Sequence, residues 1–312
     1  MSTIKYANAV AAIRAMENTL MSRGEIEQLI NSATKNEFEA VIASKRSGED
    51  LTLEGVWEML RGYAPDCKEL KILLYKNDFH NLKAALKSKI AGKEPDGYYI
   101  RPTNLDLEML YPAVSAKDYE ALPAYIRNVA EEAYELLTRT LDGQLADSLI
   151  DTAAMNEMRK AAEKSGSDFM KKYVELTVVC ADIKTAFRCA KMKKQRSFLE
   201  MAICGTDELG KDTLISAALG GVESVLSCVE NSVYADAAKL LAESPAQFEK
   251  WCDDVIMELA ETARMQAFGA EPLAAYYIAA EAELKNLRIL SVCKESGTDK
   301  ETMTERMRKL YV

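Results

Sequence analysis

The stretch Asp78-Phe79-His80-Asn81-Leu82-Lys83 returns in outline twice along the chain, as Asp182-Ile183-Lys184-Thr185-Ala186-Phe187 and Glu283-Leu284-Lys285-Asn286-Leu287-Arg288. Each copy has an acid, an apolar residue, a basic residue or His, then Asn or Thr, and then a small or apolar residue. The leading acids are 104 residues apart (78 to 182) and 101 residues apart (182 to 283) in a chain of 312 residues. Repetition at a fixed period is typical of stacked structural units. The pattern therefore predicts three similar units with pseudo-threefold symmetry, forming a ring, socket or funnel.

The sequence around all three copies has helical periodicity. Only 14 Gly and 7 Pro occur, and long segments place apolar residues three and four positions apart. Alternating β patterns with hairpin turns are absent. The sequence thus predicts an all-α protein. Four signatures mark expected helix starts: Ser22-x-x-Glu25, Thr34-x-x-Glu37, Ser244-Pro245-x-Gln247 and Thr298-x-x-Glu301.

Two breaks divide the predicted helices. Four prolines and two glycines lie between residues 92 and 123, ahead of a long helical stretch expected at about 124–164. The second break is Cys204-Gly205-Thr206-Asp207. Taken with the repeat period, the breaks predict three helical repeat domains, at 1–105, 106–205 and 206–312.

Composition narrows the class of protein. An apolar content of 48% and a charged content of 29% are typical of a soluble globular chain. The net charge of −9 argues against general nucleic-acid binding, which requires a basic surface. No uncharged apolar stretch reaches the roughly 18–20 residues that a membrane-spanning helix needs. Seven cysteines without a CxxC pair indicate free thiols. We therefore expect a cytosolic protein without direct insertion into a membrane.

Histidine chemistry is restricted to one residue. His80 is the only histidine, and it fills the repeat position that Lys184 and Lys285 fill in the other copies. This favours a polar helix face over a catalytic base and leaves no His-based metal site. We predict no catalytic residue, no cofactor and no metal.

Two further motifs are incomplete. Residues 205–211 approach the phosphate-binding pattern GxxxxGK[ST], but Asp212 replaces the hydroxyl residue and a helix precedes the run. Asp253-Asp254 lacks the carboxylate that a DDxxD magnesium motif places three residues later. We interpret the first as a polar interdomain loop and the second as a solvated helix face.

A basic cluster stands out on this acidic chain. Cations near a helix C-terminus stabilise the helix dipole, which gives the cluster a structural explanation. A docking surface for an acidic partner or an anionic membrane surface is the functional alternative, and both remain open. The cluster consists of Lys184, Arg188, Lys191, Lys193, Lys194 and Arg196.

The run from Glu271-Pro272 through Tyr276-Tyr277 to Glu283-Leu284-Lys285-Asn286-Leu287-Arg288 ends in a pattern of acid, Lys, Asn, Leu and Arg. Together with residues 305–312 and the opening helix at 6–17, it resembles the C/d subunit family of V-type and A-type rotary ATPases. Ala12 stands where many members carry Arg.

The resemblance implies a non-catalytic central-stalk subunit with three similar helical domains arranged as a funnel. Its implied partners are the central shaft subunits of the soluble ATPase head and the membrane proteolipid ring. The implied location is the cytoplasmic face of the membrane, where rotation of the shaft is coupled to proton or sodium transport. The alternatives are a generic α-helical repeat scaffold for another protein and a helical enzyme.

The polar residues of the repeat are the candidate functional residues. We expect them to line or brace the central opening, or to form interdomain hydrogen bonds that hold three units in register. The six are Asp78, Asn81, Asp182, Thr185, Glu283 and Asn286.

Overall fold

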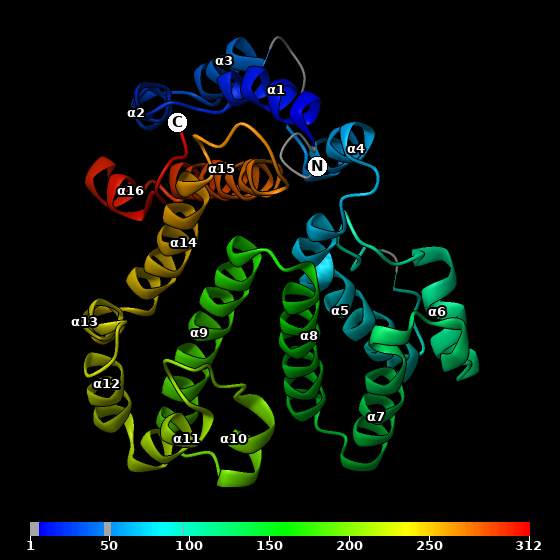
Figure 1. Ribbon diagram of the computed structural model, residues 1–312. Helices are drawn as coiled ribbons and strands as arrows, with labels where there is room; N and C mark the ends of the chain where they lie inside the picture. The colour runs from blue at the N-terminus through cyan, green and yellow to red at the C-terminus, as the bar shows by residue number, and fades with distance from the viewer. Residues whose placement is uncertain (1–5, 47–50, 96) are drawn as a thin grey trace. The chain divides into compact units, whose positions relative to one another are not determined.

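The computed structural model describes residues 6–46, 51–95 and 97–312, and these residues form helices and no strand (Figure 1). The predicted all-α class is thereby confirmed. Contacts divide the chain into two compact units: unit 1 is Met1–Leu70 with Leu240–Val312, and unit 2 is Lys71–Lys239. The division into three domains at 1–105, 106–205 and 206–312, and their arrangement as a funnel or socket, stay predictions.

The helices of unit 1 come from both parts of its chain. Helix α15 is central to this unit, because it packs against α1, α4, α14 and α16 and is buried continuously from Pro272 to Ala280. The elements are α1 (Ala7–Met16), the 3-10 helix η1 (Glu17–Thr19), α2 (Arg23–Asn31), α3 (Lys35–Arg46), α4 (Leu53–Tyr63), α14 (Pro245–Thr262), α15 (Glu271–Glu295) and α16 (Lys300–Arg306).

Unit 2 is a run of helices in which α8 packs on α7 and α9, and α9 also contacts α10, α11 and α12. Two helices, α5 and α13, cross the boundary between the units. The elements are α5 (Lys68–Ala91), α6 (Leu107–Ala116), η2 (Tyr119–Ala121), α7 (Ala124–Thr140), α8 (Gly143–Ser165), α9 (Asp168–Lys191), α10 (Arg196–Ala202), α11 (Lys211–Gly220), α12 (Val222–Glu230) and α13 (Ala235–Glu243).

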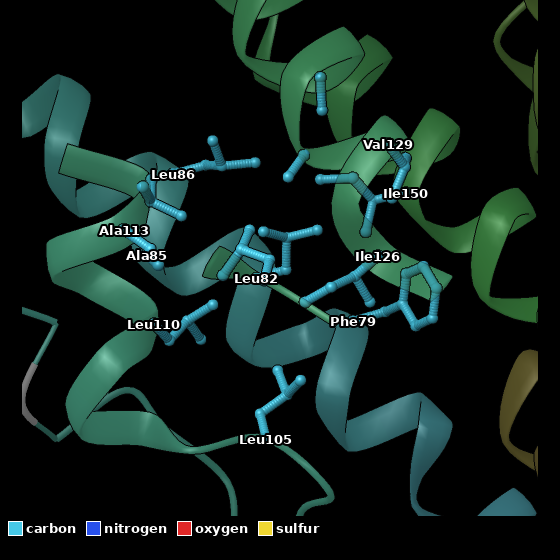
Figure 2. Close-up of a cluster of buried hydrophobic side chains, with 14 of the residues drawn as sticks. Phe79, Leu82, Ala85, Leu86, Leu105, Leu110, Ala113, Ile126, Val129 and Ile150 are labelled. Carbon is cyan, nitrogen blue, oxygen red and sulfur yellow. The ribbon is translucent and has the colours of Figure 1, made fainter. Parts of the chain in front are cut away.

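A hydrophobic cluster joins α5 to α6, α7 and α8 within unit 2 (Figure 2). Phe79 and Leu82 of α5 are both nearly inaccessible to solvent, and they meet Leu110 of α6 and Ile126 of α7. Burying each side chain of this size contributes about 1.5–3 kcal/mol of favourable free energy. The apolar positions of the first repeat copy therefore build this core, and two of its polar residues, Asp78 and Asn81, are buried beside it.

Three of the four predicted helix starts are confirmed. Ser22 forms a capping box with Glu25, and Ser244 accepts a hydrogen bond from the backbone of Gln247. The hydroxyl of Thr34 accepts from the backbone N–H of Glu37 over 3.2 Å. The fourth is wrong by one residue, as α16 is capped by Asp299, whose carboxylate accepts from the backbone N–H and the hydroxyl of Thr302.

The expected helical stretch at 124–164 is present as two helices, α7 and α8. They are separated by a break at Leu141, which adopts φ 55°, and Asp142, which caps the next helix. Asp is a strong N-cap because its carboxylate accepts from free N–H groups, here those of Gln144 and Leu145. The proline-rich region at 92–123 is not a plain connector, since it contains α6, with Pro112 inside it, and η2.

The seven cysteines are free thiols, as predicted. Over the parts of the chain that the structure describes, no helix combines the length and the apolar character needed to cross a membrane.

Candidate functional site

The first repeat copy places a buried carboxylate at the centre of four hydrogen bonds. Asp78, on α5, is inaccessible to solvent. Its Oδ1 accepts from the backbone N–H of Asn104 over 2.7 Å and from the hydroxyl of Thr103. Its Oδ2 accepts from Asn104 Nδ2 over 2.8 Å and from the hydroxyl of Tyr125 over 2.9 Å. Burial raises the pKa of Asp78, and these four donors counteract the rise.

Asn81 lies one helical turn after Asp78 and on the same face of α5. Its Nδ2 donates to the carbonyl oxygen of Ile100 over 2.9 Å, and its Oδ1 accepts from the backbone N–H of Ile100 over 2.7 Å. The side-chain amide thus satisfies both polar groups of one residue in the segment that follows α5. Asp78 and Asn81 together fix the backbone of residues 100–104 against the helix.

The second repeat copy also binds a loop through a buried carboxylate, which accepts two hydrogen bonds where Asp78 accepts four. Asp182, on α9, is 2% exposed, and its two oxygens accept from the backbone N–H groups of Cys204 (3.0 Å) and Gly205 (2.6 Å). Burial raises the pKa of Asp182 to about 6, although the two N–H groups, Arg159 and Lys211 oppose the rise. Thr185 is half-buried. Its hydroxyl offers a single oxygen atom, whereas the amide of Asn81 has separate donor and acceptor atoms for the N–H and the carbonyl of one residue.

The third copy holds two segments of unit 1. Glu283, on α15, is 4% exposed and accepts from the backbone N–H of Met21 over 2.6 Å. It also forms a buried ion pair with Arg46. Burial raises the pKa of Glu283, and the Met21 N–H and the Arg46 charge lower it again.

Asn286 is inaccessible to solvent and holds the C-terminal segment. Its Oδ1 accepts from the backbone N–H of Arg308 over 2.9 Å, and its Nδ2 donates to the carbonyl of the same residue over 3.3 Å. The asparagines of the first and third copies therefore make the same contact.

The interpretation of Asp253-Asp254 as a solvated helix face is wrong. Asp253 pairs with Lys285 over 2.6 Å and with Arg308 Nε over 2.8 Å. Asp254 accepts from the backbone N–H of Lys309 over 2.6 Å. Both carboxylates of α14 are only partly exposed, because the C-terminal segment lies against them. Sequence reasoning missed this role, since the partners are 32 to 55 residues away along the chain.

His80 and the loop at 205–211 each contact a backbone carbonyl of the same chain. His80 is exposed, and its Nε2 lies 3.3 Å from the carbonyl oxygen of Tyr98, in keeping with a polar helix face. Helix α10 precedes the loop at 205–211, as predicted, and Lys211 Nζ donates to the backbone carbonyl of Glu200 over 2.5 Å. That lysine is engaged within the chain.

Five of the six candidate residues therefore share one chemical role in the structure, which is to bind backbone polar groups. Asp78, Asp182 and Glu283 are buried acceptors for backbone N–H groups, and the two asparagines each hold a peptide group. Such contacts fix loops against long helices, because a buried carboxylate without donors would be strongly unfavourable. Within unit 2 the first two copies serve different loops, and the third belongs to unit 1. Whether the six residues also line or brace a central opening stays a prediction.

Comparisons with known proteins agree with the resemblance found in the sequence. A sequence profile described as ATP synthase (C/AC39) subunit matches residues 9–306. The chain is 26% identical to the C subunit of the V-type sodium ATPase of Enterococcus hirae, over 99% of both chains. A shorter match, 25% identical over 38% of both chains, is with the C subunit of the V-type ATP synthase of Thermus thermophilus.

Proposed function

The chain belongs to the ATP synthase (C/AC39) subunit family, and from this membership we propose that it is the non-catalytic central-stalk subunit of a V-type or A-type rotary ATPase. The observation that carries the proposal is the near-complete length of the family match. The match begins within α1 and ends with the last residue of α16, which supports proposing one role for the chain as a whole.

In the proposed complex the subunit lies on the cytoplasmic face of the membrane, between the central shaft of the soluble head and the proteolipid ring. Torque generated by ATP hydrolysis passes through it to the ring, which moves protons or sodium ions. The subunit itself has no active site. Its contribution is mechanical, and so the property that matters is resistance to deformation.

The buried polar contacts support this mechanical role. A loop that is held only by solvent-exposed hydrogen bonds opens locally at low free-energy cost, whereas a loop bound to a buried carboxylate does not. Asp78, Asp182 and Glu283 each bind backbone N–H groups in this way. We propose that the six repeat residues, including Thr185, brace three similar helical domains around a socket that receives the shaft.

A reconstitution experiment tests the function. Membranes lacking this chain should retain ATP hydrolysis by the detached head and lose ATP-driven ion transport, and adding the purified chain should restore transport. Heat-denatured chain is the control for the addition. Equal loss of hydrolysis and transport, or unaltered transport without the chain, would contradict the proposal.

A pull-down tests the partners. The affinity tag belongs at the amino end, since Tyr311 is buried and its carbonyl accepts a hydrogen bond from Arg264. The tagged chain should retain shaft and proteolipid subunits when the complex is extracted from native membranes. Retention of an unrelated protein in their place would favour the generic scaffold.

A further inference from the structure

Two turns of unit 2 form a single surface, which we call the turn surface. One turn joins α7 to α8 at Leu141 and Asp142, and the other joins α9 to α10 at residues 192–195. Because only two residues connect α8 to α9, these helices are antiparallel, and the start of α8 lies beside the end of α9 (Figure 1). Lys194 Nζ donates to Gln144 Oε1 over 2.7 Å, which links the two turns directly.

The α9–α10 side of the turn surface is basic, in contrast to the rest of the chain, while the α7–α8 turn contributes one acid, Asp142. Residues 183–199 contain six cations and no acid, so the remaining residues carry a net charge of −15 (−9 less 6). Arg196 pairs with Glu200, but Arg188, Lys191 and Lys193 are exposed and form no ion pair with a described residue. Stabilising the dipole of α9 requires cations only in its last turn, and Lys193 lies beyond that turn. The positive charge exceeds what the helix needs.

Exposed apolar side chains lie on the same surface. Leu141 is 79% exposed and Met192 is 54% exposed. Leu141 also adopts the left-handed conformation, with φ 55°, where glycine would avoid the contact between Cβ and the backbone. A leucine that fills no core at such a position costs the fold conformational energy without contributing packing. Its side chain is available to a partner.

We propose that the turn surface binds the anionic phospholipid headgroups of a membrane. Unpaired cations around exposed apolar side chains are the combination that binds the membrane interface, because the cations meet the headgroups while the apolar side chains enter the boundary with the acyl chains. Two of the three unpaired cations are lysines, whose flexible stems suit mobile headgroups, whereas fixed bidentate pairing with a carboxylate is a property of arginine. The inference rests on the proposed function for its location and identifies the surface through which the subunit contacts the membrane.

Vesicle co-sedimentation of the purified full chain tests the inference. Vesicles of equal parts phosphatidylglycerol and phosphatidylcholine should bind the chain, vesicles of phosphatidylcholine alone should not, and added salt should weaken binding. The triple variant Arg188→Gln, Lys191→Gln, Lys193→Gln should bind about a hundredfold more weakly. Leu141→Gly should also weaken binding, while relieving the left-handed strain and so preserving the fold.

The matched control changes one arginine and two lysines elsewhere in unit 2. The variant Arg101→Gln, Lys164→Gln, Lys239→Gln alters three exposed cations outside the turn surface and should bind like the unaltered chain. Equal binding by both triple variants, or equal binding to both kinds of vesicle, would overturn the inference. Retention on polyglutamate without binding to vesicles would assign the surface to an acidic protein and also overturn it.

The outcome is separable from that of the proposed function. A chain that joins the rotary ATPase but never binds vesicles overturns only the lipid contact. A chain that binds anionic vesicles through the turn surface but never joins the complex supports the lipid contact and removes the proposed function.

Discussion

Asn81 on α5 and Asn286 on α15 each hold one downstream residue by both its N–H and its carbonyl. The residues held are Ile100, 19 positions later, and Arg308, 22 positions later. The short repeat in the sequence thus corresponds to a repeated physical contact. The contact is between a rigid helix and the chain that follows it.

Replacing Asn286 tests the value of this contact. Asn286→Ala leaves the N–H and carbonyl of Arg308 without partners in a buried place, so the free energy of unfolding should fall by about 2–4 kcal/mol. Denaturant unfolding measures the loss. Asn231 is exposed and serves as the control, since Asn231→Ala should cost under about 0.5 kcal/mol. Equal losses of unfolding free energy in the two variants would show that the contact between Asn286 and Arg308 does not stabilise the fold more than an exposed asparagine does.

Asp182 should make stability depend on pH. Its pKa is about 6 in the folded chain against an ordinary value of 3.8, so the folded state binds the proton more tightly than the unfolded state. The resulting stabilisation is complete below pH 3.8 and is lost as the pH rises through 6. Between pH 4 and pH 7 the unfolding free energy of the unaltered chain, relative to Asp182→Asn, should fall by about 2 kcal/mol.

Asp207 provides the control for the pH measurement, because it is exposed on the loop whose backbone Asp182 binds. As a substitution at an exposed site, Asp207→Asn should change the unfolding free energy by under about 0.5 kcal/mol. A constant difference between the unaltered chain and Asp182→Asn would contradict the raised pKa.

Removing only one partner of the buried ion pair between Arg46 and Glu283 should lower the free energy of unfolding strongly. Arg46→Met leaves the Glu283 carboxylate buried with only the Met21 N–H, and the unfolding free energy should fall by about 3–5 kcal/mol. Adding Glu283→Gln removes the unpaired charge and retains an acceptor for Met21, so part of the stability should return. Thermal and denaturant unfolding of the single and double variants measure this. A double variant less stable than Arg46→Met alone would contradict the pairing.

Asp254 should control local opening of the C-terminal segment. Asp254→Ala removes the acceptor for the Lys309 N–H, and hydrogen exchange at that amide should speed up by about tenfold or more. Glu258→Ala is the matched control, since Glu258 contacts the side chain of Lys309 and not its backbone. Exchange that is unaltered by Asp254→Ala would show that the segment is held elsewhere.

The helical class, three of the four helix starts that the sequence marks and the helix faces of the repeat residues follow from local sequence rules. The spacing of Asp78 and Asn81 places them on one helix face. Phe79 and Leu82 follow them directly in the sequence, and their burial in the core keeps the adjoining polar face close to it. Local rules fail where a short polar signal competes with helix propensity. Asp142 and Asp299 are examples. Each caps a helix with its carboxylate and so fixes the residue at which that helix begins, and the sequence patterns did not predict either cap.

The partners of the buried acids could not be predicted, since they are set by tertiary packing. Tyr125 reaches Asp78 from 47 residues away, and Arg46 reaches Glu283 from 237 residues away. Asp253 was misinterpreted for the same reason. An acidic pair on a helix has the same sequence pattern whether it faces water or a neighbouring cationic segment, and only the fold distinguishes the two.

Unit 1 is built from two separate parts of the chain, and this affects how it can fold during synthesis on the ribosome. Helices α1 and α4 pack on α15, which is made some two hundred residues later, so the earliest part of the chain emerges without its partner. Unit 2 is contiguous and is complete before that partner leaves the ribosome. The amino-terminal helices can therefore complete their packing only after α15 has been made, and until then their apolar faces lack the surface that buries them.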